Sequence, residues 1–583
     1  MPETRTCTLT GKQFQITDED RAFYERIGVP LPTLAPLERR RQRLAYRNDR
    51  KLYRRACDLC KQSIIATHEE KAPYPVYCNT CWWSDKWNAE NYGREFNFNR
   101  PFFEQWHELN SAVPHIALWQ IQNENSDFSH DSSFCKDCYM LFGADYNRNC
   151  YYSANVVYAK DCCDCLAVNH CERLYECTDC FESQFDYYSQ LLRNSSNCYF
   201  CFDMINCHNC FGSAGLRNKS YYFYNEQLTP EEYEKRMKEI LPLTHDRLFE
   251  YIKKSYDVSL KVPRKYLVQK NCEDSVGGYL GHCKNVHDSF DLEECRDASH
   301  CAIAYQCKDI SDCEVIFYNG EVCYGSHTLI KNCFMCFFSF FLRDVKEAWY
   351  CNECYSSQNL FGCVGLRQKK FYILNKEYPA DEYHALVERI KNHMIEERVH
   401  STSAEESGPI RSMMARRLSS GSAGSGAYKK EFGEFFPIAL APFAYNESAG
   451  YDYILPSLNK EEAVALGYRW KDEDPKEYKP QTFTVPLKIT DVTESIMNEL
   501  LACTKCGKNF KITKQELIFY KQNNVPIPIA CFDCRHRARL LRRGPRVLYD
   551  RACQLCNAPI KTIYAPERPE MVYCEACYLA TVY

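Results

Sequence analysis

The chain has 583 residues, with 73 Lys and Arg against 77 Asp and Glu and a formal net charge of −4. This balance excludes a uniformly basic nucleic-acid coat, so any polyanion must be bound by a local patch. The 38 cysteines are many for this length. The N-terminus lacks the apolar core of a signal peptide and no apolar run is long enough to span a membrane, so we expect a cytoplasmic protein with no membrane contact. In that reducing compartment, cysteines indicate thiols and metal sites rather than disulfides.

The two ends of the chain are copies of one module. Residues 7–81 and 503–577 align without a gap at a constant offset of 496. In the C-terminal copy, two sets of paired C-x-x-C motifs follow each other, with 24 intervening residues in the first set and 17 in the second. Each set offers four thiolates, which close a tetrahedral Zn²⁺ site and leave no open position for catalysis. We therefore predict structural zinc on Cys503, Cys506, Cys531 and Cys534, and on Cys553, Cys556, Cys574 and Cys577.

The N-terminal copy keeps only its second set of cysteines. In the first set Cys7 remains, but the other three ligand positions hold Thr10, Ala35 and Glu38. This half of the copy retains the apolar residues of the fold without the metal ligands, which favours a scaffold over a reaction centre. A third structural zinc site is predicted on the cysteines that keep the 17-residue spacing, which are Cys57, Cys60, Cys78 and Cys81.

The stretch CTKCGKNFKITKQELIFYKQNNVPIPIACFDCRHR resembles a family of probable zinc-ribbon or treble-clef domains. The shared pattern is C-x-x-C-G-K-x-F, a helix with Phe-Tyr, and a second motif C-x-x-C-R. The resemblance covers residues 503–537 and, in degraded form, residues 7–41, and it implies zinc on the first cysteine set. The whole chain also resembles large cysteine-rich bacterial proteins that carry this domain and have no assigned activity. Both resemblances therefore imply metal binding alone.

A basic segment lies between the two cysteine sets of each copy. Arginine suits phosphate because its planar fork donates to two oxygens at once, and zinc modules beside such runs are typical of nucleic-acid readers. We therefore predict that these segments bind RNA or another polyanion. Two alternatives are that the charges face acidic surfaces of the same protein or an acidic partner. The predicted contacts are Arg535, Arg537, Arg539, Arg542, Arg543 and Arg546, and Arg39, Arg40, Arg41, Arg43, Arg47 and Arg50.

Residues 82–134 form a connector that is rich in large aromatic side chains. We expect these side chains to cover the open end of the central repeat, where unpaired strand edges need protection. A platform for stacked bases is the alternative. The aromatic residues are Trp82, Trp83, Trp87, Phe102, Phe103, Trp106 and Trp119.

The centre of the chain has a six-residue repeat that is visible in its cysteines. From Cys138 to Leu216 every sixth residue is apolar except Asp186, and the residue three places later is usually Cys, Ser or Ala. An aromatic residue follows every second apolar position, which doubles the repeat to twelve. Such a period fits a β-solenoid in which each coil has two short strands and two turns. A three-sided coil of eighteen residues is the alternative.

The narrow interior of such a coil favours Cys, Ser, Ala and Val, and free Cys is among the most buried residue types. We therefore interpret the central cysteines as buried thiols. Close pairs such as Cys162 and Cys165 also have the spacing of zinc knuckles, but the six-residue repeat produces this spacing by itself. Additional zinc sites, disulfides and an Fe–S cluster are the alternatives.

The solenoid is interrupted and then resumed. The stretch FGSAGLRNKSYYFYNEQLTPEEYEKRMKEI recurs 150 residues later as FGCVGLRQKKFYILNKEYPADEYHALVERI. In the first copy, Thr229 and Pro230 predict the start of a helix with Tyr233 on its apolar face, which would cap the stack. A second apolar series begins near Leu280 and slips by two residues at Tyr324.

We predict a mainly β fold with α elements: a central, two-lobed, cysteine-rich β-solenoid with helical caps, flanked by small zinc-ribbon modules at both termini. The expected parts are a duplicated ribbon module at 1–81, the aromatic connector at 82–134, solenoid lobes at 135–216 and 272–366, a helical insertion at 217–271, a strand–helix cap at 367–399, a flexible linker at 400–430, an aromatic docking segment at 431–500 and tandem zinc ribbons at 501–583.

The leading hypothesis is a non-enzymatic, cytoplasmic, zinc-binding scaffold whose ribbons and arginine-rich segments bind nucleic acid, with RNA as the favoured form. A protein–protein interaction scaffold is the second hypothesis. The third is a cysteine- or metal-dependent enzyme. The sequence disfavours this third hypothesis, because we find no phosphate loop, nucleophile elbow or His/Glu metal set in it. The oligomeric state is left open.

Overall fold

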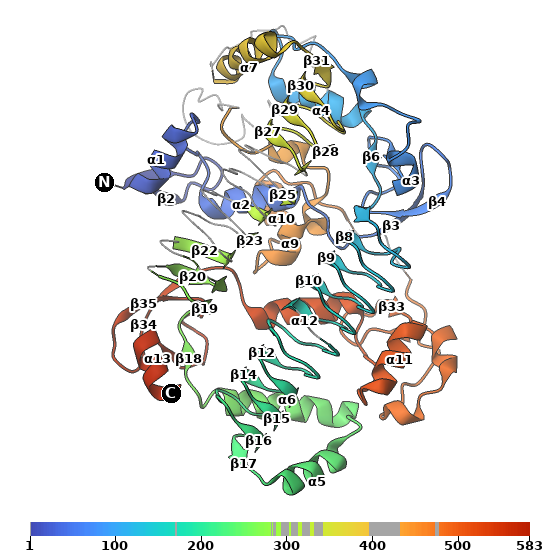
Figure 1. Cartoon of the computed structure of the whole chain (residues 1–583), viewed down its shortest axis with the longest axis vertical. Coiled ribbons are helices and arrows are strands. Elements are labelled where there is room, and N and C mark those ends of the chain that lie inside the picture. The colour runs from blue at the N-terminus through green and yellow to red at the C-terminus, as the bar shows by residue number, and fades with distance from the viewer. Residues whose placement is uncertain are drawn as a thin grey trace. The chain divides into compact units, whose positions relative to one another are not determined.

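The computed structural model describes residues 2–582 except 170–171, 274, 282, 284–286, 293–301, 305–312, 317–326, 331–341, 396–431 and 473–476. The predicted linker at 400–430 lies outside the described residues. The chain divides into two compact units, and each unit joins segments that are far apart in the sequence (Figure 1). The first unit comprises Met1–Ala117 and Leu267–Lys471, and the second comprises Leu118–Tyr266 and Asp472–Tyr583.

The second unit contains a set of parallel strands that we call the first ladder. Its strands pair with an offset of twelve residues, so that Ala154 lies beside Phe142 on one side and Leu166 on the other. This offset equals the period read from the sequence, and the pairing extends beyond 135–216 at both ends. The strands are β7 (Gln120–Ile121), β8 (His130–Ser133), β9 (Phe142–Asp145), β10 (Ala154–Val157), β11 (Leu166–Asn169), β12 (Gln190–Arg193), β13 (Ser196–Tyr199), β14 (Phe202–Ile205), β15 (His208–Phe211) and β16 (Ser220–Phe223).

Each coil of the first ladder has four corners. From Asp131 onward, every third described residue takes a left-handed backbone conformation, as do Met140, Gly143 and Tyr146 with φ of 53, 64 and 56°. Twelve residues therefore make four short sides, which differs from the predicted two strands and two turns. The sequence conceals these corners because Asn, Asp and Gly, the usual left-handed residues, occupy only some of them.

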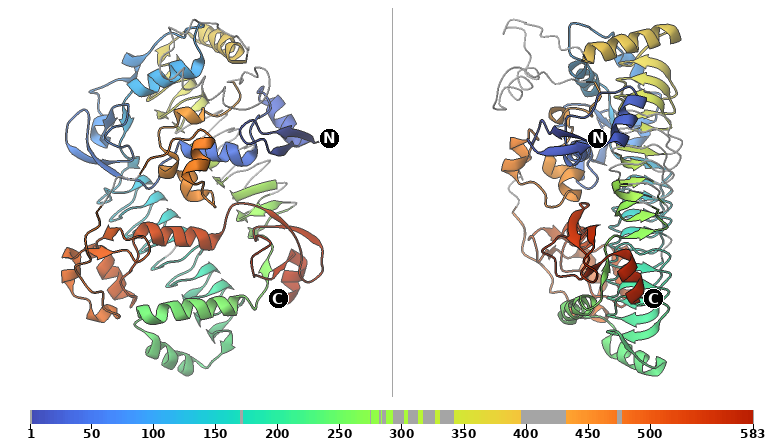
Figure 2. Two further views of the ribbon diagram at one scale, coloured as in Figure 1. Left: turned by 180° about the vertical axis from the view of Figure 1, so that it is seen from behind. Right: turned by 90° about the vertical axis from the view of Figure 1, so that its left-hand side faces the viewer.

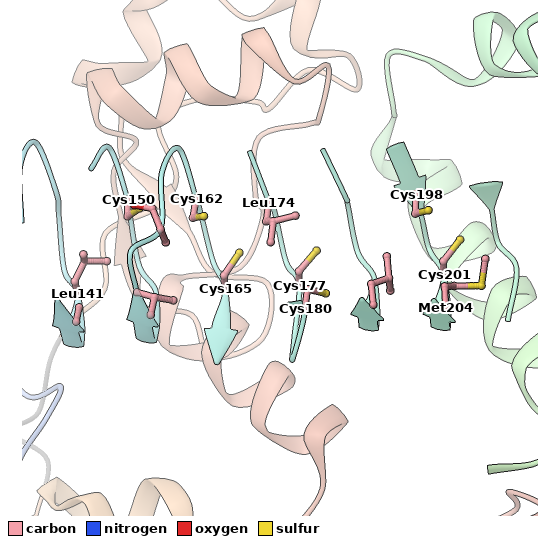
Figure 3. Packing of buried hydrophobic residues seen from close by; sticks show 14 of the residues in the cluster. Leu141, Cys150, Cys162, Cys165, Leu174, Cys177, Cys180, Cys198, Cys201 and Met204 are labelled. Carbon is pink, nitrogen blue, oxygen red and sulfur yellow. The ribbon is translucent and has the colours of Figure 1, made fainter. Parts of the chain in front are cut away.

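Between two successive corners one side chain points into the coil, so that every third residue is interior. Cys150, Cys162 and Leu174 are fully buried, and Figure 3 shows such side chains stacked from coil to coil. No disulfide joins the described cysteines. Within the described part of the ladder, these thiols form no group with the spacing of a metal site. Their arrangement therefore supports the interpretation as buried thiols.

Small polar side chains inside the ladder accept hydrogen bonds from backbone N–H groups that face the interior. Ser189 Oγ accepts from the N–H of Cys201, one coil later, at 3.0 Å. Asn147 Oδ1 accepts from the N–H of Ala159 at 2.8 Å. Because a buried amide without an acceptor costs free energy, small side chains that carry an acceptor suit these positions.

Asp186, the polar exception in the predicted apolar series, has the same role. Its side chain is fully buried, and its Oδ1 accepts a hydrogen bond from the N–H of Cys198 at 2.8 Å. Burial raises the pKa of the Asp186 carboxyl group well above its ordinary value, and the nearby Cys177 thiol raises it further. The raised pKa favours the neutral acid, which can occupy the interior as a hydrogen-bonding side chain.

The first unit contains a second set of parallel strands, the second ladder. Its pairing offset is twelve residues from Ala302 to Glu314, and thirteen from Glu314 to His327 and from Leu329 to Leu342. The predicted slip of two residues is therefore divided between two successive pairings. The strands are β20 (Val276–Gly278), β22 (His287–Leu292), β23 (Ala302–Ala304), β24 (Glu314–Ile316), β25 (His327–Ile330), β26 (Leu342–Arg343), β27 (Lys346–Trp349), β28 (Cys354–Tyr355), β29 (Gln358–Phe361) and β30 (Lys370–Ile373).

Each ladder is followed by a short antiparallel strand and a capping helix. The helix α5 (Pro230–Ile240) begins after Thr229, which forms a capping box with Glu232, and buries Tyr233 as predicted. The equivalent α7 (Ala380–Ile395) buries Tyr383. The remaining elements of this region are β17 (Glu226–Gln227), α6 (His245–Ser259), β18 (Arg264–Lys265), β19 (Gln269–Lys270), β21 (Leu280–Gly281) and β31 (Lys376–Glu377).

Aromatic side chains of the predicted connector pack on the last coils of the second ladder. The Trp82 ring lies 5.2 Å from the Tyr355 ring, and the Phe102 ring lies 5.3 Å from the Phe361 ring. These buried side chains cover the ladder and are not open to nucleic-acid bases. The connector elements are α3 (Asn79–Trp82), η1 (Ala89–Tyr92), α4 (Phe102–Ala112) and β6 (His115–Ile116).

The terminal modules consist of short hairpins and helices, shown in blue and red in Figure 1 and from two further sides in Figure 2. No helix in the described ranges is long and apolar enough to cross a membrane. The N-terminal elements are β1 (Glu3–Thr6), β2 (Gln13–Ile16), α1 (Asp18–Arg26), α2 (Pro36–Ala45), β3 (Tyr53–Ala56), β4 (Ser63–Ala66) and β5 (Val76–Tyr77). The C-terminal elements are β32 (Leu501–Ala502), β33 (Asn509–Phe510), α11 (Lys514–Gln522), α12 (Phe532–Arg543), β34 (Tyr549–Ala552), β35 (Pro559–Thr562), β36 (Val572–Tyr573) and α13 (Glu575–Val582).

The predicted docking segment at 431–500 is divided between the units. Its first part packs on the N-terminal module, where Gln42 Nε2 donates to the Phe436 carbonyl at 2.9 Å and Tyr46 donates to the Pro437 carbonyl at 2.6 Å. The segment contains η2 (Ile438–Leu440), η3 (Tyr445–Glu447), α9 (Ala449–Tyr453), α10 (Lys460–Ala465), η4 (Ile489–Asp491) and η5 (Glu494–Asn498).

The interior hydrogen bonds lead to a prediction for Ser189. We expect Ser189→Ala to lower the free energy of unfolding by about 1–3 kcal/mol, because the N–H of Cys201 loses its acceptor in a buried site. Ser189→Cys, which restores a small side chain with a weak acceptor, should lose less. Urea denaturation followed by circular dichroism measures both, and equal losses for the two variants would contradict this account of the interior.

Candidate metal centres and the arginine interface

Three groups of four cysteines bring their sulfur atoms together. Within each group the four Sγ atoms lie within 4.8 Å of one another. Sulfur–sulfur distances are 3.9 Å from Cys60 to Cys78, 3.7 Å from Cys506 to Cys531 and 3.7 Å from Cys556 to Cys574. Four sulfurs at about 2.3 Å from a tetrahedral Zn²⁺ would be about 3.8 Å apart. The cysteines of all three predicted sites thus have an arrangement suitable for holding a metal ion.

Each group is assembled from a tight hairpin and a helix. Cys503 and Cys506 lie in the turn between β32 and β33, while Cys531 precedes α12 and Cys534 lies in its first turn. The turn is closed by Gly507, whose N–H donates to the Cys503 carbonyl at 2.9 Å and whose φ is 75°. The other two groups repeat this plan with a hairpin and the first turn of α3 or α13.

Backbone N–H groups of the hairpin turn or of the helix start point at the first cysteine of each group. The N–H of Lys505 donates to Cys503 Sγ at 3.4 Å, and the N–H of Cys574 donates to Cys553 Sγ at 3.2 Å. Burial opposes ionisation, but several backbone N–H groups and one neighbouring thiol together outweigh it and lower the pKa of Cys503 and of Cys553 to about 6. The thiolate, which is the metal-binding form, is therefore favoured at these two positions.

The first half of the N-terminal module keeps the backbone of this plan without the ligands. The N–H of Cys7 donates to the Lys12 carbonyl at 2.8 Å, as the N–H of Cys503 does to the Lys508 carbonyl at 2.9 Å. Cys7 packs among Phe14, Ile16 and Leu34. Where the C-terminal copy has Cys534, this copy has Glu38, which forms a buried ion pair with Arg41. An apolar cluster and an ion pair thus stand in place of the four-cysteine group.

The arginines of α12 face carboxylates at the corners of the first ladder. Arg535 Nε lies 2.8 Å from Asp164 Oδ2, and Arg539 Nη2 lies 3.1 Å from Asp164 Oδ1. The side chains of Arg539 and Asp164 are both 0% exposed. Two further pairs extend the contact along the ladder, from Arg542 to Glu176 at 2.9 Å and from Arg543 to Asp179 at 3.1 Å. We call this set of pairs the arginine interface.

The twelve arginines predicted to contact nucleic acid are mostly inside the fold. Arg537 is exposed, whereas Arg542, Arg543 and Arg546 are half-buried. In the N-terminal module, Arg39 donates to the Tyr24 hydroxyl at 2.6 Å. The four arginines of the arginine interface agree with the alternative in which the charges face acidic groups of the same protein. The buried arginines are Arg39, Arg40, Arg41, Arg43, Arg47, Arg50, Arg535 and Arg539.

An arginine contacts an aromatic side chain at equivalent positions of both units, which sequence reasoning missed. In the second unit, Arg217 donates to the Tyr578 hydroxyl of the C-terminal module. In the first unit, the Arg367 guanidinium lies 4.9 Å from the centre of the Trp82 ring. Arg217 and Arg367 are 150 residues apart, and Trp82 and Tyr578 are 496 apart, so both partners are equivalent by the two sequence repeats. The offsets of 150 and 496 residues were the sequence signal from which these equivalent contacts between arginine and an aromatic residue could have been predicted.

The segments that lead into the ladders also pair equivalently with the modules. Val76 of β5 pairs in parallel with His115, and Val572 of β36 pairs in parallel with Arg264. The division into units adds a second link. The N-terminal module shares its unit with the second ladder, and the C-terminal module shares its unit with the first ladder, although neither pair is adjacent in the sequence.

Comparison with protein-family models, curated proteins and solved structures finds no match to this chain. A function must therefore be inferred from the chain's own geometry.

The arginine interface predicts different outcomes for two arginines of one helix. Arg539→Met should destabilise the docked C-terminal module by about 3–5 kcal/mol, because Asp164 keeps a buried charge with fewer partners. Arg537→Met removes the same charge from an exposed position of α12 and should cost about 0.5 kcal/mol or less. Hydrogen exchange of α12 in the full chain measures both, and similar effects of the two variants would count against the interface as the source of docking energy.

Proposed function

We propose that this protein is a zinc-binding scaffold whose two ladders form β-solenoids and whose terminal modules are treble clefs held by zinc. The three four-cysteine groups carry the proposal, because each gathers four sulfur atoms within 4.8 Å at the junction of a hairpin and a helix. Four thiolates complete the coordination of the metal and leave no open position for a substrate. The role proposed for the metal is therefore structural.

The twelve-residue pairing offset supports the β-solenoid. The offset holds on successive pairings of the first ladder, as from Ser196 to His208 and from His208 to Ser220. Solenoids of this kind present extended regular surfaces that suit the binding of partners along their length. As part of the same proposal, the domains have the limits predicted from the sequence, and the protein is cytoplasmic.

A row of exposed aromatic side chains on the first ladder supports a partner-binding role. Phe134, Tyr146 and Tyr158 occupy one corner of successive coils and are 36, 42 and 52% exposed. Their rings are stacked, with centres 4.7 and 5.0 Å apart. Stacking occupies the ring faces, so the row offers ring edges and hydroxyl groups to a partner. We propose that this aromatic row binds protein, since contiguous exposed apolar surface marks such sites.

Nucleic-acid binding is kept as the second candidate function because of one basic residue beside the aromatic row. Arg148 is exposed two positions after Tyr146. The basic residues in the same register on the neighbouring coils are partly neutralised, Lys136 by Glu124 at 2.7 Å and Lys160 by Glu172 at 3.5 Å. The burial of eight of the twelve arginines predicted to contact nucleic acid favours the protein-binding scaffold over this candidate.

Metal analysis tests the zinc proposal. Purified protein should contain three zinc atoms per chain, one for each four-cysteine group. Cys506→Ser should reduce the content to two, because three thiolates hold zinc more weakly than four. Cys7→Ser should leave three, because Cys7 lies in the half-module without a ligand set. Inductively coupled plasma mass spectrometry gives the content, and iron in place of zinc, or no metal, would refute the proposal.

Site-specific crosslinking separates the two partner classes. A photoreactive phenylalanine in place of Tyr146 should form adducts in cells that protease removes and nuclease does not. The matched control is the same replacement of Tyr478, which is 39% exposed and lies outside the aromatic row. Adducts sensitive to nuclease would favour the second candidate. Equal adducts from both positions, or none from Tyr146, would contradict a binding role for the row.

A further inference from the structure

One helix connects a four-cysteine group to the arginine interface. Cys531 precedes α12 and Cys534 lies in its first turn, and the next residue is Arg535, which pairs with Asp164. Arg539 follows one turn later and lies on the same face. Whatever holds the first turn of α12 therefore also sets the position of the arginines.

The neighbouring helix leads from the other half of the same group to the same ladder. α11 follows the hairpin that carries Cys503 and Cys506. Its Glu516 accepts a hydrogen bond from the Tyr152 hydroxyl at 2.9 Å, and Asn523 beside its end accepts one from the Tyr187 hydroxyl at 2.8 Å. The four cysteines thus join the two helices that contact the first ladder.

The start of α12 has little support of its own. Cys531 occupies the N-cap position, and no side chain there accepts a hydrogen bond from the first turn. The helix has 12 residues and four arginines in the interface. Helices of this length are marginal when isolated, and pairing buried charges requires that the partners be held in place beforehand. A metal on the four cysteines would supply this support.

The equivalent helix of the N-terminal copy, α2, lies against β24 of the second ladder without the cysteines. Arg43 of α2, which is equivalent to Arg539 by the offset of 496, is also almost fully buried. At the start of α2, Ala35 and Glu38 stand where α12 has Cys531 and Cys534. Glu38 pairs with Arg41 within the first turns of α2, and Pro36 fixes the first helical residue. The first turn of α2 is thus held by an ion pair and a proline.

We propose that the four-cysteine group of Cys503, Cys506, Cys531 and Cys534 is a metal-operated latch for the first ladder. With metal bound, α12 holds its arginines against Asp164, Glu176 and Asp179. When the metal is withdrawn, the first turn of α12 loses its support and the arginine interface opens. The equivalent helix α2 stays docked on its own ladder, because its first turn needs no metal. The inference rests on the proposed binding of metal by these cysteines.

The two copies suggest a pair of variants that tests the latch in the full chain. Cys531→Ala with Cys534→Ala removes two ligands and leaves nothing in their place. Cys531→Ala with Phe532→Pro and Cys534→Glu reproduces the start of α2, and Arg537 already stands where Arg41 does. Both variants should lose one zinc atom. Hydrogen exchange should become about tenfold faster or more in α12 of the first variant, a change that corresponds to about 1.4 kcal/mol, and should stay near the wild-type rate in the second.

Chelation of the wild-type protein completes the experiment, with zinc content measured in every sample. Exchange should increase in α12 and in the first-ladder residues around Asp164, and remain unchanged in α2. If the wild-type protein binds no zinc, the proposed function itself fails. If zinc is bound but its removal leaves exchange in α12 unchanged, the latch is refuted while the zinc scaffold stands. If α2 opens together with α12, or the variant with Cys534→Glu opens as fully as the alanine variant, the latch is also refuted.

Discussion

Backbone amides that face the interior of a twelve-residue coil impose the constraint on which the rest of the structure depends. A coil of this size has no room for large polar groups, yet its interior N–H groups need acceptors. Ser189, Asn147 and Asp186 provide them from one coil to the next. Small residues, thiols among them, therefore suit many of the interior positions, and the cysteine content of the ladders agrees with this requirement.

The four-cornered coil also determines how the terminal modules bind. Left-handed corner residues point outward, and Asp164, Glu176 and Asp179 are such residues. Carboxylates at these corners meet the arginines of α12, whose positive charge is therefore used within the protein. Each unit combines one terminal module with one ladder, and is therefore a combination of two separately duplicated parts.

The two copies of the terminal module hold the first turn of the equivalent helix in two different ways. The first turn of a docking helix must be held while its arginines enter a buried site. In α12 the first turn carries two cysteines of a four-cysteine group, and in α2 it carries the ion pair of Glu38 and Arg41. Loss of ligands in one copy was tolerated because the apolar cluster around Cys7 preserves the hairpin. The difference between the copies provides an internal control for the role of the metal.

The sequence by itself determined the features that depend on local spacing. These include the three cysteine groups, the twelve-residue period and the helix start at Thr229, because neighbouring ligands, repeats and caps are set within a few residues. Only the tertiary structure decided that a coil has four corners, since residues such as Met140 and Tyr146 adopt left-handed conformations under the pairing of adjacent coils. It also decided that Arg539 faces Asp164 rather than solvent. These two residues are 375 positions apart, and whether an arginine is exposed or paired depends on which distant carboxylate the fold brings to it.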